Sequence, residues 1–272
     1  MKDSPWRWQE WEGLPYLTCD LLTPWRHGFF TQQCYPNHPE QLVKALHPEA
    51  KVYRVQQVHG NQVLTPQEIN SAMTKQNLDQ KFPKADGIMS DYETQALWVA
   101  SADCNPVLIG DVKTRKVAAI HAGWRGTSQK IVPEAIALLQ ASGSNLEDLR
   151  IAMGAAITGE VYQVTETVAA EVGKSIVSSK ELGNELIKQK DGETEEILTA
   201  LFEMEDSPLI EDAQPGRVKL DVRRVNAIQL EQLGISQSQI AIAPHCTYQQ
   251  PEYWFSYRRT KEKKVQWSGI VA

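Results

Sequence analysis

Short apolar runs, each about as long as one β-strand, recur between residues 51 and 244, separated by polar segments that contain Gly and Pro. Residues 51–58 alternate between apolar and polar positions, whereas the later runs are more continuously apolar and are typical of buried strands. Strands are therefore predicted at 51–58, 94–101, 106–110, 116–121, 148–153 and 240–244. The intervening segment 76–91 is polar and broken by Pro and Gly, which predicts a loop.

Capping residues mark three helices among these strands. A helix over about 127–142 is predicted to begin at Thr127 or Ser128, and a second helix begins near residue 164. Asp221 suits the N-cap of a third helix, which Gly234 ends. Because strands and helices intermix without strict βαβ alternation, we expect an α/β fold of α+β-like character, with mixed sheets packed against helices.

The composition is that of an ordinary globular protein. Of the 272 residues, 42% are hydrophobic and 23% are charged, so the chain can form one large domain or two small ones. No apolar stretch approaches the roughly 20 residues of a membrane span. The first residues lack the apolar core of a signal peptide, which favours a cytoplasmic location.

The negative charge is concentrated in one segment. The net charge is −6, but residues 181–212 contain 11 acidic and 2 basic residues, or −9, which leaves about +3 for the rest. We interpret 181–212 as a partly helical surface insertion. No cluster of basic residues indicates nucleic-acid binding. The acidic segment leaves open a protein that binds a partner without catalysis, which deletion of 181–212 would test.

Three side chains form a candidate metal site. The four cysteines include no CxxC pair, and only Cys104 has neighbours that suggest chemistry. His59, Cys104 and His121 lie 45 and 17 positions apart, too far for a zinc finger, but each lies where a predicted strand gives way to a loop. Imidazole and thiolate both suit zinc, and three protein ligands leave one coordination position open for catalysis.

Two neighbouring residues are candidates for catalysis. Asp103 adjoins Cys104 and could orient a ligand or carry a proton, although an Asp at a turn commonly caps the turn. Arg125 could bind phosphate through its planar guanidinium, or it could form a surface cation–π pair with Trp124. The same residues also permit a hydrolase with Cys104 as nucleophile and His121 or His59 as base.

A series of motifs resembles one known family. The segments QVHGN, ADGIMS, SADCNPVLIGD, AAIHAGWRGT, LDVRRVNAIQLEQLGI, HCTY and FSYRR occur in this order. Over about residues 27–271 the chain resembles the YfiH family, which is also called the laccase-domain, multicopper polyphenol oxidase-like or purine nucleoside phosphorylase family. The chain departs from the family pattern at QQCYPNHPEQ, at GEVYQV and after FSYRR, where we expect the substrate pocket to be shaped.

The resemblance implies a fold, a metal and a reaction. It implies a single domain of layered mixed sheets over residues 1–272, similar to the catalytic domain of cytotoxic necrotizing factor, and zinc bound by His59, Cys104 and His121. The implied activities are phosphorolysis of adenosine, inosine and 5′-methylthioadenosine, and deamination of adenosine. Purine nucleoside and phosphate are then the expected partners, with no nucleic acid or membrane, for a monomer or weak dimer.

The family's older name suggests a copper-dependent polyphenol oxidase. A four-copper centre needs more imidazole ligands than the six histidines of this chain supply, and the chain lacks HxH pairs. We therefore exclude a four-copper laccase. Cu²⁺ could still occupy the predicted zinc site, because it binds nitrogen and sulfur ligands more tightly than Zn²⁺ does.

Overall fold

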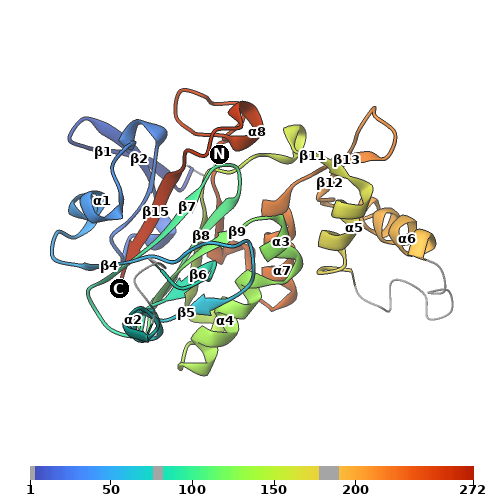
Figure 1. Ribbon diagram of the computed structural model, residues 1–272. Helices are drawn as coiled ribbons and strands as arrows, with labels where there is room; N and C mark the ends of the chain where they lie inside the picture. Colours follow the sequence, from blue (N-terminus) through green and yellow to red (C-terminus); the bar gives the residue numbers. More distant parts are fainter. Residues whose placement is uncertain (1–3, 76–81, 178–189) are drawn as a thin grey trace.

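Two six-stranded mixed sheets form the centre of the protein (Figure 1). A computed structural model describes residues 4–75, 82–177 and 190–272. The first sheet has the order β1 (Trp6–Trp11), β2 (Leu14–Cys19), β3 (His27–Phe30), β15 (Gln266–Val271), β7 (Gln95–Ser101) and β4 (Lys51–Tyr53). The second has the order β14 (Ile240–Ile242), β10 (Leu149–Met153), β8 (Asn105–Asp111), β9 (Val117–Ala122), β6 (Gly87–Met89) and β5 (Val63–Leu64).

The two sheets pack face to face, with helices on their outer faces. Alternation along β8 explains this layering, because Leu108 joins the core between the sheets whereas Val107 and Ile109 point to the opposite face. Helices α4 (Ile131–Ala141) and α7 (Val222–Gln232) cover that outer face of the second sheet. Helix α1 (Pro39–Leu46) covers the outer face of the first sheet. The result is the predicted α/β fold of mixed sheets flanked by helices.

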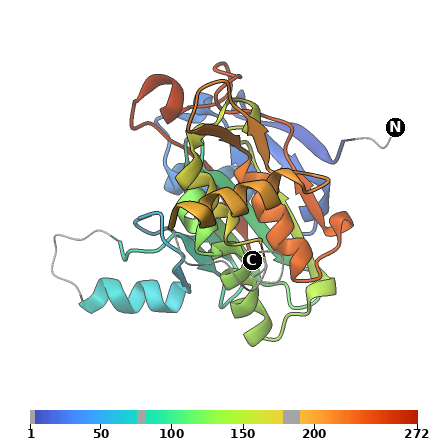
Figure 2. The same ribbon diagram turned by 90° about the vertical axis from the view of Figure 1, so that its right-hand side faces the viewer.

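A smaller layer extends to one side of the large sheets, at the right of Figure 1. It contains the three-stranded sheet β11 (Gln163–Thr165), β13 (Arg217–Leu220) and β12 (Leu209–Glu211), together with α5 (Glu166–Gly173) and α6 (Lys190–Phe202). Ile197 and Leu201 of α6 are fully buried in its core. The part of the acidic segment before residue 190 lies outside the described residues. Figure 2 shows α6 in front of the sheets and α2 (Pro66–Lys75), in cyan, projecting at the lower left.

The predicted strands 94–101, 106–110, 116–121 and 148–153 are confirmed to within one residue at each end, as β7 to β10. The strand at 240–244 is shorter, as β14, and 51–58 is wrong beyond Tyr53. After Tyr53 only Gln56 forms an isolated bridge, because the chain turns away toward the candidate site. Strand β6 lies within the predicted loop 76–91, of which 76–81 is outside the described residues.

The predicted helix over 127–142 is divided in two. The first turn is α3 (Trp124–Ser128), which follows Gly123, and Lys130 then adopts the left-handed conformation before α4. Thr127 caps neither helix, because its hydroxyl pairs with buried Asn226. The third helix is confirmed: the Asp221 carboxylate caps the first turn of α7, and Gly234 follows with φ +94°. No helix of the described residues is long and apolar enough to cross a membrane.

Candidate metal centre

Three chain segments bring His59, Cys104 and His121 together at one edge of the second sheet. His59 lies in the loop between β4 and β5, Cys104 in the turn between β7 and β8, and His121 is the next-to-last residue of strand β9. The Nδ1 or Nε2 atoms of the histidines and the Sγ atom of Cys104 all lie within 4.8 Å of one another. The two imidazole rings meet edge to face, with centroids 4.9 Å apart. His121 is buried, Cys104 is half-buried and His59 is exposed, so the cluster opens to solvent on one side.

Asp86, just before β6, holds two members of this cluster. Its buried carboxylate accepts the backbone N–H groups of Val58, His59 and Gly60 at 3.0, 2.9 and 2.8 Å. The same carboxylate accepts the Nδ1–H of His121 at 2.9 Å. Burial acts to raise the pKa of Asp86, but the hydrogen bonds from His121, Gly60 and Val58 and the charge of His121 outweigh burial and lower the pKa below its ordinary value, so the carboxylate is ionised. Asp86 thus directs the Nε2 of His121 toward Cys104.

The surroundings of Cys104 favour a thiolate. Burial raises the pKa of Cys104, but the charge of His121 and hydrogen bonds from His121 and His59 outweigh it and lower the pKa to about 6. The pKa of His121 is lowered by burial but raised more by Cys104 and Asp86, to about 9. A positively charged imidazole therefore lies between two anions. Metal ligation uses the same thiolate and exchanges the proton on His121 for a cation.

Glycine is required where the backbone passes closest to the cluster. A Cβ atom on Gly123 would lie 2.9 Å from the Sγ atom of Cys104 and 3.3 Å from the ring of His59. A Cβ atom on Gly126 would lie 2.9 Å from the carbonyl oxygen of Gly60. The two contacts of 2.9 Å are too short for any other residue without displacement, which explains the two glycines of the HAGWRG motif.

Asp103 and Arg125, the two candidate catalytic residues, lie beside the cluster in different surroundings. The Asp103 carboxylate accepts hydrogen bonds from the Thr247 hydroxyl and the Arg258 backbone N–H, both at 2.7 Å. Asp103 itself has φ +89°, an uncommon conformation for a residue other than glycine. Arg125 is exposed, with its guanidinium carbon 4.2 Å from the centroid of the Trp124 ring.

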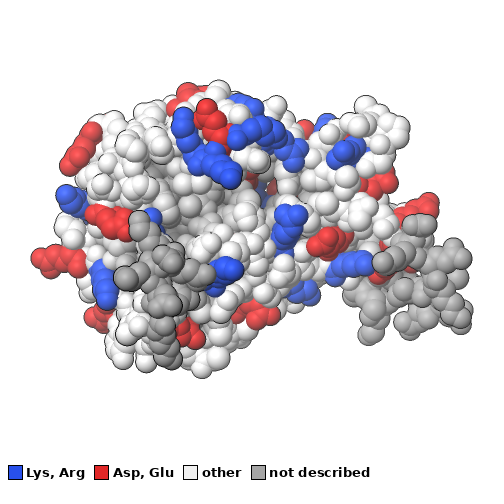
Figure 3. Space-filling model, viewed as in Figure 1, with Lys and Arg blue, Asp and Glu red and all other residues white. Residues whose placement is uncertain are grey.

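All five predicted site residues line a cavity of about 460 Å³. Cations outnumber acids along its wall, which includes Arg125, Arg258, Lys263 and Lys264 against Asp103 and Glu262. In Figure 3, basic side chains gather around the hollow beneath α8 (Tyr257–Thr260). The cavity therefore combines a cluster of potential metal ligands with a positive rim that suits an anionic substrate.

Tyr162 and Arg258 line this cavity but were not among the predicted site residues. Burial, followed by the charge of Cys104, raises the pKa of Tyr162 to about 12, so the phenol stays protonated. The Arg258 guanidinium lies over the Tyr162 ring at 4.8 Å. Tyr162 stands in GEVYQV, a departure from the family pattern, and Arg258 in the FSYRR motif, but neither segment assigns a role to the side chain.

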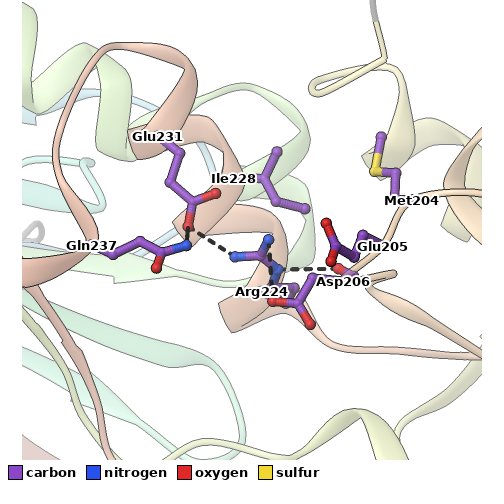
Figure 4. Close-up of a pocket in the computed structure, with 7 residues that line it drawn as sticks. All are labelled: Met204, Glu205, Asp206, Arg224, Ile228, Glu231 and Gln237. Carbon is purple, nitrogen blue, oxygen red and sulfur yellow. Dashed lines mark hydrogen bonds and ion pairs between the residues drawn. The ribbon is translucent and has the colours of Figure 1, made fainter.

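A cavity of about 590 Å³ lies elsewhere, between α7 and the end of α6 (Figure 4). Arg224 crosses it and pairs with Asp206 and Glu231. This cavity is larger, but its charged groups largely satisfy one another. Among residues 4–75, 82–177 and 190–272, only His59, Cys104 and His121 form a group able to hold a metal ion. We therefore locate the candidate site by its chemistry, not by cavity size.

Comparisons with known proteins identify the family of this chain. The chain matches the family described as "Multi-copper polyphenol oxidoreductase laccase" over residues 36–271, and it belongs to that family. It is 53% identical over 272 residues to a purine nucleoside phosphorylase of Synechocystis, covering 100% of this chain and 99% of the relative. A purine nucleoside phosphorylase of Bacteroides thetaiotaomicron is 29% identical over 82% of this chain and 74% of the relative.

Two solved structures share the fold. The crystal structure of YlmD from Geobacillus stearothermophilus has a TM-score of 0.76 at 21% identity, covering 97% of this chain and 98% of that one. The crystal structure of the Bacillus licheniformis hypothetical protein YfiH has a TM-score of 0.73 at 21% identity, covering 99% of each chain. The mixed sheets with flanking helices are thus the architecture of the YfiH family.

Proposed function

We propose that this protein is a zinc-dependent purine nucleoside phosphorylase that acts on adenosine, inosine and 5′-methylthioadenosine. The observation that carries the proposal is the convergence of His59, Cys104 and His121, within 4.8 Å, on a cavity with a cationic rim. The name of the Synechocystis relative, which matches over the full length of this chain, supports the substrate class.

The three side chains fit zinc. Zn–N distances of about 2.0–2.1 Å and Zn–S distances of about 2.3 Å require ligand atoms a few ångströms apart, as these are. Cys104 is disposed to ionise, and Asp86 fixes the ring nitrogen that His121 presents. When bound, zinc would supply a Lewis acid that polarises an oxygen atom at its open position. Copper is an alternative occupant of the same ligands.

The chain's own residues provide for phosphate. Arg125, Arg258 and Lys263 line one cavity, so their positive charges can hold inorganic phosphate beside the nucleoside. In phosphorolysis a phosphate oxygen forms a bond to the ribose C1′ while the glycosidic C–N bond breaks. The base departs with the electron pair and takes up a proton. Because positive charge develops on the ribose, a positioned phosphate anion stabilises the transition state.

Deamination of adenosine is proposed as a second activity of the same centre. Asp103 supports it, since this carboxylate lines the cavity next to Cys104. Its hydrogen bonds from Thr247 and Arg258 fix the carboxylate in place, so that it can take a proton from water and give it to the departing ammonia. Formation of inosine from adenosine without phosphate tests this activity separately.

Zinc content and turnover should be measured together. We expect about one zinc per chain in the wild-type protein, and phosphate-dependent release of adenine from adenosine. Cys104→Ala should lose the metal and at least about 100-fold in turnover. The matched control is Cys34→Ala, because Cys34 is buried in the core under α1 and should leave both quantities unchanged.

The same experiment distinguishes the alternatives. A Cys104 nucleophile with His121 as base would work in a metal-free protein, and a strong chelator would leave its turnover intact. A copper polyphenol oxidase would consume oxygen with phenols and show no dependence on phosphate. Full phosphorolysis by metal-free Cys104→Ala would end the proposal.

A further inference from the structure

A second, smaller cavity adjoins the first behind Cys104. It measures about 30 Å³ and shares Asp103, Cys104, Trp124 and Tyr162 with the wall of the larger cavity. Asn105, the first residue of β8, also lines it. The space has room for about one water molecule or one small group of a larger ligand. The inner cavity is therefore a recess at the base of the candidate site.

Asn105 has no partner for its side-chain amide. The residue is only 1% exposed, and neither its Nδ2 nor its Oδ1 atom has a hydrogen-bond partner among the described residues. Asn226, the other asparagine that is buried in the described part of the chain, differs: its Nδ2 donates to the Thr127 hydroxyl and the Val222 carbonyl. Buried amides in folded proteins are nearly always hydrogen-bonded. An amide with both ends free, beside a recess, indicates a place for a polar ligand group.

The chemistry of the amide indicates which group. An asparagine side chain presents a donor and an acceptor side by side, the pattern that pairs in bidentate fashion with an edge of a purine base. By rotating the amide it can accept from a 6-amino group or donate to a 6-oxo group. The rings of Trp124 and Tyr162 line both cavities. Arg125 lies over one face of Trp124 and Arg258 over one face of Tyr162, so a base would pack against the opposite face or the edge of either ring.

We propose that Asn105 recognises the 6-position edge of the purine base, while the ring lies in the outer cavity against Trp124 or Tyr162. Asn105 is then a specificity-determining residue that allows both 6-amino and 6-oxo nucleosides. This inference rests on the proposed function and adds the orientation of the base. The ribose and phosphate extend toward His59 and Arg125, which line only the outer cavity.

The test compares kcat/KM for adenosine and inosine. In Asn105→Asp the carboxylate can accept from a 6-amino group but cannot donate to a 6-oxo group, so the adenosine-to-inosine ratio should rise at least about tenfold. Asn145→Asp, the same change in the loop before β10 and outside both cavities, should leave the ratio unchanged. An unchanged ratio in Asn105→Asp overturns the inference. The recess beside Asn105 would then be a site for water and not for the base.

A second variant keeps the test valid if Asn105→Asp fails to fold. The wild type should prefer adenosine to purine riboside, which lacks the 6-substituent, and Asn105→Ala should lose at least about tenfold of that preference. A preference equal to that of the wild type overturns the inference. If the wild type turns over no purine nucleoside, the proposed function itself fails. If the wild type turns over purine nucleosides but the Asn105 variants keep its substrate preferences, only the role assigned to Asn105 is wrong.

Discussion

Asp86 shows how one side chain can organise a site without lining it. It is separated by 27 positions from His59 and by 35 from His121, yet its carboxylate binds the backbone of one and the ring of the other. Its backbone carbonyl also accepts the N–H of His121 at 2.7 Å. Rigid ligands bind metal more tightly because less order is lost on binding. The affinity of the centre should therefore depend on Asp86.

We predict that Asp86→Asn weakens zinc binding by about 10- to 100-fold. The amide keeps the size of the side chain, but it loses the charge and one acceptor, so some of its four partners are left unpaired. Competition with a colorimetric zinc chelator measures the change. Asp111→Asn is the control, because that carboxylate is equally buried and caps a turn away from the site. Equal zinc affinity in both variants would contradict the prediction.

The two kinds of site residue differ in how far the sequence reveals them. His59, Cys104 and His121 are chemically distinctive and stand in recognisable motifs, so the sequence alone indicates the cluster. Asp86 and Asn105 also stand in motifs, ADGIMS and SADCNPVLIGD, but they are common residue types, and their importance rests on which backbone groups and cavities they meet. Those contacts arise between segments that are distant in the chain, so no local pattern reports them.

At the scale of elements, the break between α3 and α4 positions the HAGWRG motif. Lys130 has φ +59°, in the left-handed region, and no side chain caps the start of α4. Because the left-handed Lys130 changes the direction of the chain, α3 remains a single short helix against β9 while α4 covers the sheet. An L residue in this conformation carries a strain of roughly 1–2 kcal/mol that glycine avoids.

Lys130→Gly should therefore stabilise the protein by about 0.5–1 kcal/mol, after subtracting the greater freedom of glycine in the unfolded chain. Urea denaturation of the metal-free protein measures the free energy of unfolding. Gln129→Gly, one residue earlier with an ordinary φ of −90°, should instead destabilise the protein. Equal effects at the two positions would show that the left-handed conformation of Lys130 carries no strain.

Strands with a clear run of apolar residues are predicted well from the sequence. Strands whose extent depends on pairing with another strand are not. Strands β7 to β10 are apolar over most of their length because nearly all of their residues are buried, and their sequence shows it. In the hairpin of β1 and β2, β1 is mostly exposed and mixes Trp with polar residues, whereas β2 is half-buried or buried, and no strand is predicted there from the sequence. The strand at 51–58 was extended too far, since the alternation continues past Tyr53 although the pairing stops.

At the scale of the whole molecule, burial between the layers makes stability depend on pH. His27 on β3 is 6% exposed, and its Nε2 accepts the N–H of Cys19 at 2.8 Å. Its Nδ1 lies 2.9 Å from the Trp25 carbonyl, which can only accept, so Nδ1 carries the proton. A second proton on Nε2 would confront the N–H of Cys19. Burial accordingly lowers the pKa of His27, in spite of the bond to Trp25.

The direction of the pH effect follows from this neutral imidazole. Above a pH of about 6.5, His27 is neutral in both the folded and the unfolded chain, and its contribution to stability is complete. Below that pH only the unfolded chain takes up the proton, so each further unit of acidification removes up to about 1.4 kcal/mol until the lower folded pKa is reached.

Unfolding by urea at pH 7.5 and 5.5 should show a greater loss of stability for the wild type than for His27→Gln, which lacks this titration. The other titrating groups, including His245 and the metal-site residues, are common to both proteins and cancel in the difference. Parallel losses in the two proteins would mean that His27 is protonated in the fold, against the hydrogen bond from Cys19.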